Sequence, residues 1–365
     1  MIDRRAFLIG FAACLLSDPV RAAYRVNGRL IPSDNRRLRD IPFTPLENIP
    51  NHRQFMRDII IELSTYAKAK AGQFTILMRD APELLIKQQR EWDWESGRDL
   101  DGAAEGKFTP VGDVNRELLK AIDGILIDGL FCGRDAVNQP TDEAETKTLL
   151  AAVDALKKEG RDTLSIEYAT GKKEIAEASR KTGHARVLSY LAGDRLLGRV
   201  PHGHPPQENP DHVMDLKNAK NFLPMASSTS FGNRDDWVTA LTTTNYDLLV
   251  IDPFWRGAEP LTAKDVQALK MKRLGSRRLV FATLSLGRAI DTRPYWKKEW
   301  KVGNPAWLVA PDPNAPGQMM VSYWEAEWKE LLGLYMQGLL GLGFDGVVFD
   351  HADAYLYFEE MMPLK

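Results

Sequence analysis

Eight short apolar runs are spaced along the chain and separated by stretches with helical periodicity. The runs are rich in β-branched and aromatic residues, a composition typical of parallel strands that are buried on both faces. We expect strands at residues 74–78, 124–127, 163–168, 187–190, 222–225, 248–252, 279–284 and 347–350. Eight strands alternating with helices predict an α/β fold, a (β/α)8 TIM barrel in one domain over residues 43–365. A doubly wound sheet is the alternative.

The intervals between the runs carry apolar residues at spacings of three and four. This periodicity predicts helices around residues 55–63, 149–156, 266–269 and 331–339. Thr141-Asp142 is a start signal for the second of these helices, and Gly160 is a stop signal. The polar, acidic stretch 92–112 predicts a long loop, and the Pro- and His-rich stretch 202–215 predicts a linker or crossover.

The first 23 residues have the pattern of a secretory signal. Arg4-Arg5 and Phe7-Leu8 lead into an apolar run that ends at Leu16, and small residues follow near Ala23. The Arg pair favours twin-Arg export, and the run is too short for a membrane span. We therefore predict a signal peptide at 1–23 and a periplasmic or secreted protein, with lipoprotein processing at Cys14 left open. The mature chain would keep one cysteine, Cys132, and no internal disulfide.

Composition narrows the function classes. With 365 residues, 44% hydrophobic and 27% charged, the chain is neither disordered nor a polytopic membrane protein. A formal charge of −2 gives no basic footprint for nucleic acid. No Gly-x-Gly-x-x-Gly follows a strand and no His/Cys cluster has zinc spacing, so we predict neither cofactor nor metal. Seven of the nine Trp lie between Trp237 and Trp328, which indicates a surface for flat ligands such as sugars.

In a barrel the chemistry lies at the carboxyl ends of the strands. The polar residues at those positions are Asp80, Asp128, Glu167, Asp252, Arg288 and Asp350. Any one of these carboxylates could instead cap the following helix, but several at one mouth could divide the acid and nucleophile roles of glycoside cleavage. Among the aromatic residues, Trp255 follows a strand end, whereas we expect Trp300, Trp307 and Trp328 to pack between helices and barrel.

The last strand and its flanks carry a resemblance to a known family. Residues 343–350 (GFDGVVFD) with Asp353-Ala354-Tyr355 resemble the "GFDGVYLD…DAY" signature of the endo-α-1,4-polygalactosaminidase-like barrels, glycoside hydrolase family 114 and relatives. Residues 245–252 (NYDLLVID) resemble that family's "YDLVVID" strand, and residues 284–287 with 293–296, then 323–328, resemble its following motifs. Together these motifs cover about residues 219–359.

The family continues with further β/α units, and the matching motifs here lie at the front of the chain. Residues 74–84, 122–131 and 165–168 resemble them. The resemblance therefore implies a circular permutation, in which residues 43–201, equivalent to the family's second half, precede residues 219–359, equivalent to its first half. We expect the last strand to lie beside the first.

The resemblance also implies roles. Asp350 and Asp128 correspond to the family's catalytic pair, although Asp128 replaces a Glu and so withdraws its carboxyl by about 1.5 Å. Arg288 replaces a Glu, and residues 78–81 depart from the family's "PQNG" turn. The remaining residues that we expect to bind substrate are Asp252, Trp255, Glu167, Asp80, Arg79, Arg288, Trp296, Trp324 and Tyr190.

Two functions from different classes follow. The first is an exported glycoside hydrolase acting on a galactosamine-type polysaccharide through its paired carboxylates. The second is a degenerate barrel that binds a polysaccharide, an oligosaccharide or an envelope protein partner without cleaving it.

Overall fold

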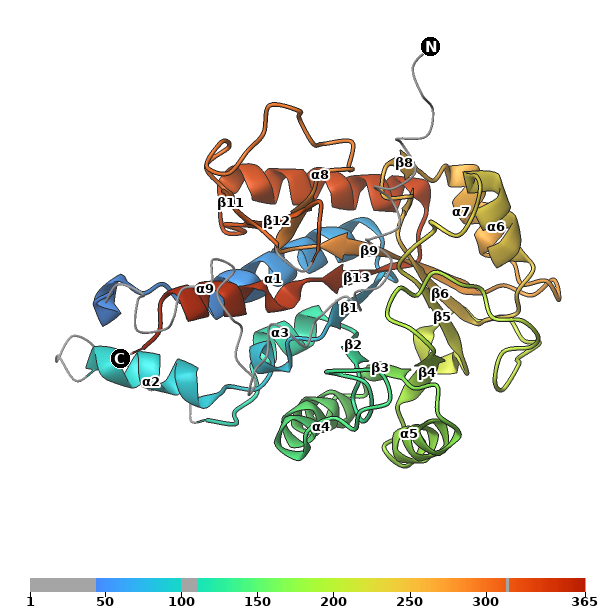
Figure 1. Ribbon diagram of the computed structural model, residues 1–365, viewed down its shortest axis with the longest axis horizontal. Coiled ribbons are helices and arrows are strands. Elements are labelled where there is room, and N and C mark those ends of the chain that lie inside the picture. The colour runs from blue at the N-terminus through green and yellow to red at the C-terminus, as the bar shows by residue number, and fades with distance from the viewer. Residues whose placement is uncertain (1–43, 100–110, 313–314, 365) are drawn as a thin grey trace, which may run out of the picture.

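Eight parallel strands form a nearly closed barrel in the computed structural model, which describes residues 44–99, 111–312 and 315–364 (Figure 1). In the order of the sheet the strands are β4 (Leu188–Ala192), β3 (Asp162–Tyr168), β2 (Gly124–Asp128), β1 (Thr75–Arg79), β13 (Gly346–Asp350), β9 (Leu279–Ser285), β6 (Leu248–Ile251) and β5 (Phe222–Met225). All eight predicted strands and the barrel are confirmed.

The last strand lies beside the first, as predicted. Met78 is in register with Phe349, and β13 also pairs with β9, so it lies in the middle of the sheet (Figure 1). A Cβ on Gly346 would be 2.6 Å from the carbonyl oxygen of Thr75, so the close approach of β13 and β1 requires glycine there. Every closed barrel brings its two end strands together, so this pairing supports the barrel whatever the order of its halves.

The barrel is incomplete between β4 and β5, and we call this gap the seam. Cα atoms of the two strands approach within 8 Å, but no ladder of hydrogen bonds joins them within the described residues. Pro224 lies in β5 and has no N–H to donate, which is typical of a strand at the edge of a sheet.

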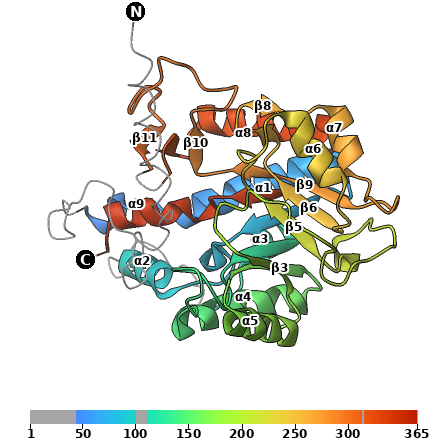
Figure 2. The same ribbon diagram turned by 45° about the vertical axis from the view of Figure 1, so that its right-hand side comes forward.

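Helices surround the barrel (Figure 2). They are α1 (His52–Lys70), α2 (Gln89–Asp99), α3 (Arg116–Ala121), α4 (Glu143–Lys158), α5 (Lys172–His184), α6 (Arg234–Thr242), α7 (Ala263–Leu269), α8 (Ala326–Leu342) and α9 (Tyr355–Met361). The four predicted helices are confirmed, and the Asp142 carboxylate caps α4 by accepting from the N–H groups of Ala144 and Glu145. No described helix is long and apolar enough to cross a membrane, and the predicted signal peptide lies outside the described residues.

The predicted loop at 92–112 is wrong over its first part, because α2 continues to Asp99. Two long-range contacts hold this polar segment: the Trp94 indole N–H donates to the carbonyl of Ile49 at 2.8 Å, and Arg57 binds Glu91 at 2.9 Å. Such contacts override the local composition. Residues 100–110 lie outside the described residues.

One connection between barrel strands differs from all the others. Each consecutive pair of barrel strands is joined through an α-helix except β4 and β5, whose connection at residues 193–221 contains only the 3₁₀ turn η5 (Leu216–Asn218). We call residues 193–221 the crossover, and its irregular course confirms the prediction for 202–215. Because α1 precedes β1, the chain has a helix before its first strand and lacks one at the seam.

The core has two apolar layers, because alternate strand residues face opposite ways. Leu77, Leu126, Val250, Phe281 and Val348 belong to the cluster inside the barrel, and their neighbours on each strand pack under the helices. Outside the barrel lie a hairpin of β7 (Phe254–Trp255) and β8 (Glu259–Pro260) and a small antiparallel sheet of β10 (Arg288–Ile290), β12 (Gln318–Val321) and β11 (Leu308–Pro311).

Short 3₁₀ turns complete the described structure: η3 (Leu46–Asn48), η4 (Pro82–Leu84) after β1, and η6 (Ala352–Ala354) after β13.

Candidate functional site

Three charged side chains form the uppermost layer of the barrel interior. Arg79, Asp128 and Asp350 each end a strand and follow an interior residue by two positions. Since side chains alternate along a strand, these three point into the barrel at its carboxyl end. The fold therefore brings together residues from three strands that are distant in sequence.

Arg79 bridges the two aspartates. Its Nη2 lies 2.7 Å from Asp128 Oδ2, and its Nη1 lies 3.2 Å from Asp350 Oδ2. Guanidinium nitrogens are about 2.3 Å apart, so the two bound oxygens lie within about 8 Å of one another, inside the range that glycosidase carboxyl pairs use. Burial opposes the charge of Arg79, yet Asp128 and Asp350 raise its pKa well above the ordinary value. The three groups form one ion-paired unit with a formal charge of −1.

Asp80 holds the backbone of this unit. Its Oδ1 accepts from the Asp128 N–H at 3.0 Å and from Arg134 Nη1 at 3.1 Å, and Arg134 also donates to the carbonyl of Asp128 at 2.7 Å. Asp80 and Ala81 both have φ of +55°, a left-handed conformation that is strained for residues with a Cβ. The strain turns the chain sharply after β1 and places the Asp80 carboxyl beneath β2.

We call the charged layer of Arg79, Asp128 and Asp350 the rim. Asp252, just after β6, extends it. Its Oδ2 pairs with Arg293 at 3.0 Å, and its Oδ1 accepts from the Phe254 N–H at 3.0 Å. Burial raises the pKa of Asp252 and nearby Asp350 raises it further, while Arg293 opposes both effects. We did not predict Arg293, although it lies in the Arg-Pro-Tyr-Trp run that carried part of the resemblance.

His351 fixes the other oxygen of Asp350. The His351 N–H donates to Asp350 Oδ1 at 2.9 Å, and its ring Nδ1 lies 2.8 Å from Ser285 Oγ, at the end of β9. His351 has φ of +56°, so it is a third strained residue at this end of the barrel, after Asp80 and Ala81. Each carboxylate oxygen of Asp350 thus has a protein contact.

Two predicted residues point elsewhere. The Glu167 side chain points to the outer face of β3, opposite to the interior residues of that strand, and it is fully buried. Its Oε2 accepts from the N–H groups of Phe131 and Cys132 at 3.0 and 2.8 Å. Burial raises the pKa of Glu167. Arg288 pairs with Asp312 at 2.9 Å on the small sheet. Glu167 therefore anchors the loop after β2, and the positive charge of Arg288 is matched by Asp312.

The predicted aromatic residues are dispersed. Trp324 packs in a cluster with His52 and Phe358, and Trp296 packs edge-on against Trp300. Trp307 and Trp328 are 2% and 1% exposed, which confirms their predicted packing role. Trp300 is partly buried and contacts Trp307 as well, with ring centroids 5.0 Å apart.

The last two predicted aromatic residues lie in different places. Trp255 lies on the hairpin after β6 beneath the guanidinium of Arg256, and no partner for its indole N–H occurs within the described residues. Tyr190 lies in β4 at the seam, where it lines a cavity described below. Of the whole predicted set, Arg79, Asp80, Asp128 and Asp350 are joined directly, and Asp252 is coupled to them through Asp350.

Comparison with known proteins gives relatives without an assigned activity, and no protein-family model matches the chain. An uncharacterized protein of Deinococcus radiodurans is 39% identical over 118 residues, covering 32% of this chain and 37% of the relative. An uncharacterized protein of Methanocaldococcus jannaschii is 30% identical over 152 residues, covering 42% and 43%, and one of Thermotoga maritima is 38% identical over 79 residues, covering 22% and 24%. The chain thus spans well under half the length of each of these relatives.

Proposed function

We propose that this protein is a carbohydrate-active barrel that hydrolyses an amino-sugar polysaccharide of the galactosamine type, with Asp350 and Asp128 as its paired carboxylates. The observation that carries the proposal is their convergence on one guanidinium at the carboxyl end of the barrel. The resemblance of residues 219–359 to the polygalactosaminidase-like barrels supports the substrate class.

In this proposal Asp350, fixed by His351 and Arg79, stabilises or attacks the sugar carbon, and Asp128 protonates the leaving oxygen. The arginine that replaces the family's Glu does not oppose this chemistry, because Arg288 is paired with Asp312. One step is required first: Arg79 must move, because its guanidinium lies between the two carboxylates where the scissile bond has to enter.

Arg79 also favours a second function, a barrel that binds polysaccharide or an envelope protein partner without cleavage. A guanidinium between two carboxylates occupies the space in which the scissile bond would lie. The two proposals differ in whether the bridge opens when a polymer binds.

The test is incubation of the purified protein with α-1,4-linked galactosamine polymer, with new reducing ends as the readout. Hydrolysis predicts product from the native protein, a loss of at least about a hundredfold in Asp350→Asn, and unchanged product in Asp154→Asn, an exposed aspartate on α4. Binding without product would establish the second function. No binding and no product would reject both.

We also propose that the barrel is circularly permuted, with residues 43–201 equivalent to the second half of its relatives and 219–359 to the first. A helix before the first strand and a helix-free crossover are what cutting one loop and sealing another would leave. Short matches to relatives fit as well, because a linear alignment of a permuted chain covers one half. A solved structure of the Methanocaldococcus relative would test this. Its first barrel strand should superpose on β5, and superposition on β1 would contradict the permutation.

Export through the signal peptide at residues 1–23 completes the proposal and places the protein in the periplasm or outside the cell. Expression of the full chain followed by N-terminal sequencing of the extracellular or periplasmic product tests it. Cleavage near Ala23 is expected, and retention of the intact chain in the cytoplasm would contradict export.

A further inference from the structure

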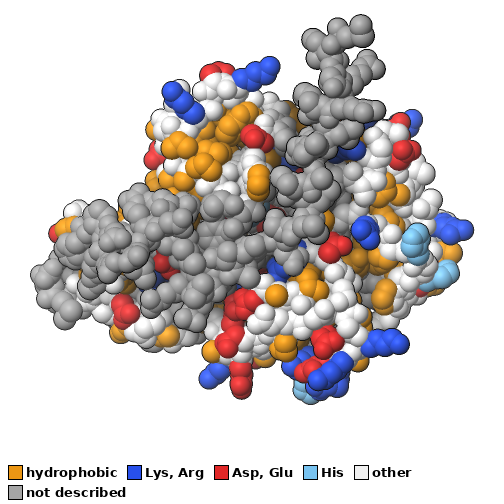
Figure 3. Space-filling model, viewed as in Figure 1, with side chains coloured by type: hydrophobic (Ala, Val, Ile, Leu, Met, Phe, Trp, Pro, Cys, Tyr) orange, Lys and Arg blue, Asp and Glu red, His pale blue; other side chains and the backbone are white. Residues whose placement is uncertain are grey.

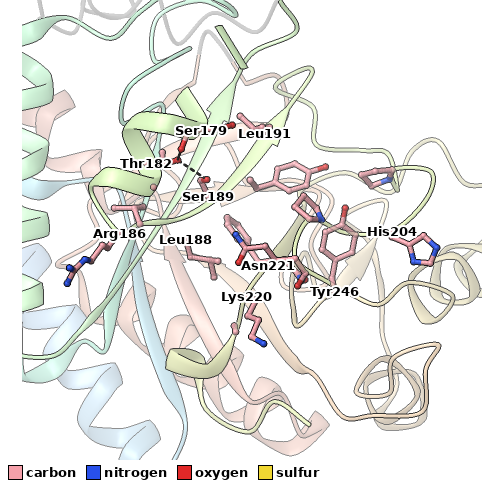
Figure 4. Close-up of a pocket in the computed structure, with 18 residues that line it drawn as sticks. Ser179, Thr182, Arg186, Leu188, Ser189, Leu191, His204, Lys220, Asn221 and Tyr246 are labelled. Carbon is pink, nitrogen blue, oxygen red and sulfur yellow. Dashed lines mark hydrogen bonds between the residues drawn. The ribbon is translucent and has the colours of Figure 1, made fainter. Parts of the chain in front are cut away.

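A cavity of about 640 Å³ opens at the seam, away from the charged rim (Figure 4). Its walls come from the end of α5, from β4, from the crossover and from the start of β5, with Tyr246 just before β6. The volume lies within the range of pockets for small organic ligands, about 300–1,000 Å³.

The cavity exists because the crossover contains no helix. At the other strand pairs a helix about 10 Å wide covers the barrel. Here the side chains of β4 from Leu188 to Leu191 are partly exposed, unlike those of the central strands β1, β2 and β13, which are mostly buried. An inserted strand would need about 9.5 Å between its neighbours. Since Cα atoms of β4 and β5 lie within 8 Å, the seam has room for a small molecule but not for a strand.

The cavity lining contains basic residues and no acidic ones, whereas carboxylates predominate at the rim. None of the lining residues is Asp or Glu, whereas Arg186 and Lys220 both line the cavity, and neither has an ion-pair partner among the described residues. Over the crossover, histidine and basic side chains gather at the right-hand margin of the face shown in Figure 3. Arg186 and Lys220, two exposed cations at the margin of the cavity, are available to an anion.

One aromatic face contributes to the lining. The ring of Tyr190 is partly exposed at the cavity, and its face suits the C–H surface of a sugar ring. Phe222, with its ring centroid 6.0 Å away, is buried behind it. Ser179 and Ser189 also line the cavity, but their hydroxyls already bind the carbonyl of Ile175 and the hydroxyl of Thr182.

Tyr246 is the decisive residue. Its side chain is 4% exposed and lines the cavity, and its hydroxyl has no hydrogen-bond partner among the described residues. In Figure 4 it lies beside Asn221, and the ammonium of Lys220 points away from the Tyr246 hydroxyl. Burial raises the pKa of Tyr246 to about 12, so the phenol stays protonated and can donate. A donor that lines a cavity without a protein partner is available to a ligand or to water.

We propose that the seam cavity binds the ring of an acidic sugar, a hexuronate, whose carboxylate accepts from the Tyr246 hydroxyl, with the exposed side chain of Lys220 turning toward it, while the sugar ring packs on Tyr190. This site is separate from the carboxylate pair of the rim and does not depend on hydrolysis there.

The test is titration of the purified protein with free glucuronate and galacturonate at low salt. Calorimetry or ligand-observed NMR measures the binding, and glucose and galactosamine serve as the neutral and cationic comparisons. Uronates are expected to bind at least about tenfold more tightly than glucose, since one charged hydrogen bond contributes at least that much. Galactosamine is expected to bind no better than glucose.

Two variants locate the binding. Tyr246→Phe should weaken uronate binding about tenfold and Lys220→Met about fivefold, and raised salt should reduce the effect of Lys220. Tyr66→Phe on α1 and Lys173→Met on α5 are matched controls that should bind as the native protein does. Thermal melting checks that each variant is folded.

Equal binding of glucose and uronate would overturn the proposal, as would uronate affinity that Tyr246→Phe leaves unchanged. The rim is independent of this result. Asp350→Asn should bind uronate normally, so a failure of hydrolysis and a failure of seam binding are distinguishable.

Discussion

The rim and the seam differ in whether their polar side chains have partners within the protein. At the rim Arg79, Asp128 and Asp350 bind one another, and Asp252 binds Arg293. At the seam the Tyr246 hydroxyl and the Lys220 ammonium have no partners among the described residues. Rim chemistry therefore requires that an existing contact be broken, whereas seam chemistry needs only a ligand. An ion-paired cluster and a cavity whose polar groups have no protein partner are two distinct kinds of candidate site.

Below the seam a buried network fixes the crossover. Lys272 and Asp247 pair at 2.6 Å with both side chains fully buried, and Lys272 also donates to the carbonyls of Asn209 and Asp211 at 2.8 Å. Asn209 donates to Asp247 in turn, at 3.1 Å. The seam is thus open along its strands but held at its amino-terminal end.

The largest effect is expected from breaking that network. Lys272→Met leaves the Asp247 carboxylate buried without its cation, so the free energy of unfolding should fall by about 3–5 kcal/mol. Urea denaturation measures it, with Lys264→Met, an exposed lysine on α7, as the control. The double variant Asp247→Leu/Lys272→Met should recover part of the loss. A small loss in the single variant would mean that the crossover is held by other contacts.

A somewhat smaller loss is expected at the rim. Arg79→Met removes the cation between two carboxylates, but the Asp350 side chain is 16% exposed and water can partly replace the guanidinium. We expect the free energy of unfolding to fall by about 2–3 kcal/mol, measured in the same way. Unchanged stability would contradict the bridge, and Arg161→Met, whose cation pairs with Asp123 near the surface, is the control.

Hydrogen exchange should separate the two regions without any substitution. Amides of β4 and β5 lack a ladder partner on the seam side, whereas those of β1 and β13 lie in the middle of the sheet. We expect exchange about tenfold faster at the seam, equivalent to about 1.4 kcal/mol less protection. Equal protection in all four strands would mean that the barrel closes fully in solution.

The remaining prediction concerns alkaline pH. The pKa of Tyr246 is raised to about 12 by burial, above its unfolded value of about 10. The unfolded chain loses this proton first, so stability falls as pH rises between those values. Tyr246→Phe should therefore lose less stability than the native protein between pH 10 and pH 12, measured by urea denaturation at each pH. An identical pH slope would place the Tyr246 hydroxyl in water.

Much of the fold could be predicted because it depends on local pattern. The eight apolar runs specify the strands, and the alternation Leu77-Arg79, Leu126-Asp128 and Val348-Asp350 indicates that these charges share one layer. The same alternation places Glu167 on the opposite face of β3 from Ile166 and Tyr168. The sequence pattern could therefore have predicted that Glu167 faces away from the barrel interior.

The rest depended on contacts that no local pattern contains. Arg288 on β10 reaches Asp312, just after β11, because both strands pair with β12 in the small sheet. The segment α2 is helical because Arg57 and the carbonyl of Ile49 bind it. The seam cavity follows from a helix that is missing, and a Pro-rich segment alone does not indicate what its absence leaves exposed.

The place of β13 in the sheet has a consequence for how the protein is made. A chain emerging from the ribosome presents β1 long before β13, so the free edge of β1 has to wait while residues 80–345 are synthesised. An unpaired strand edge attracts other chains. A shortened product that ends before β13 would lack Asp350, leaving Arg79 with Asp128 alone. A nascent chain therefore lacks the complete charged cluster until β13 is inserted. A truncated chain never forms it.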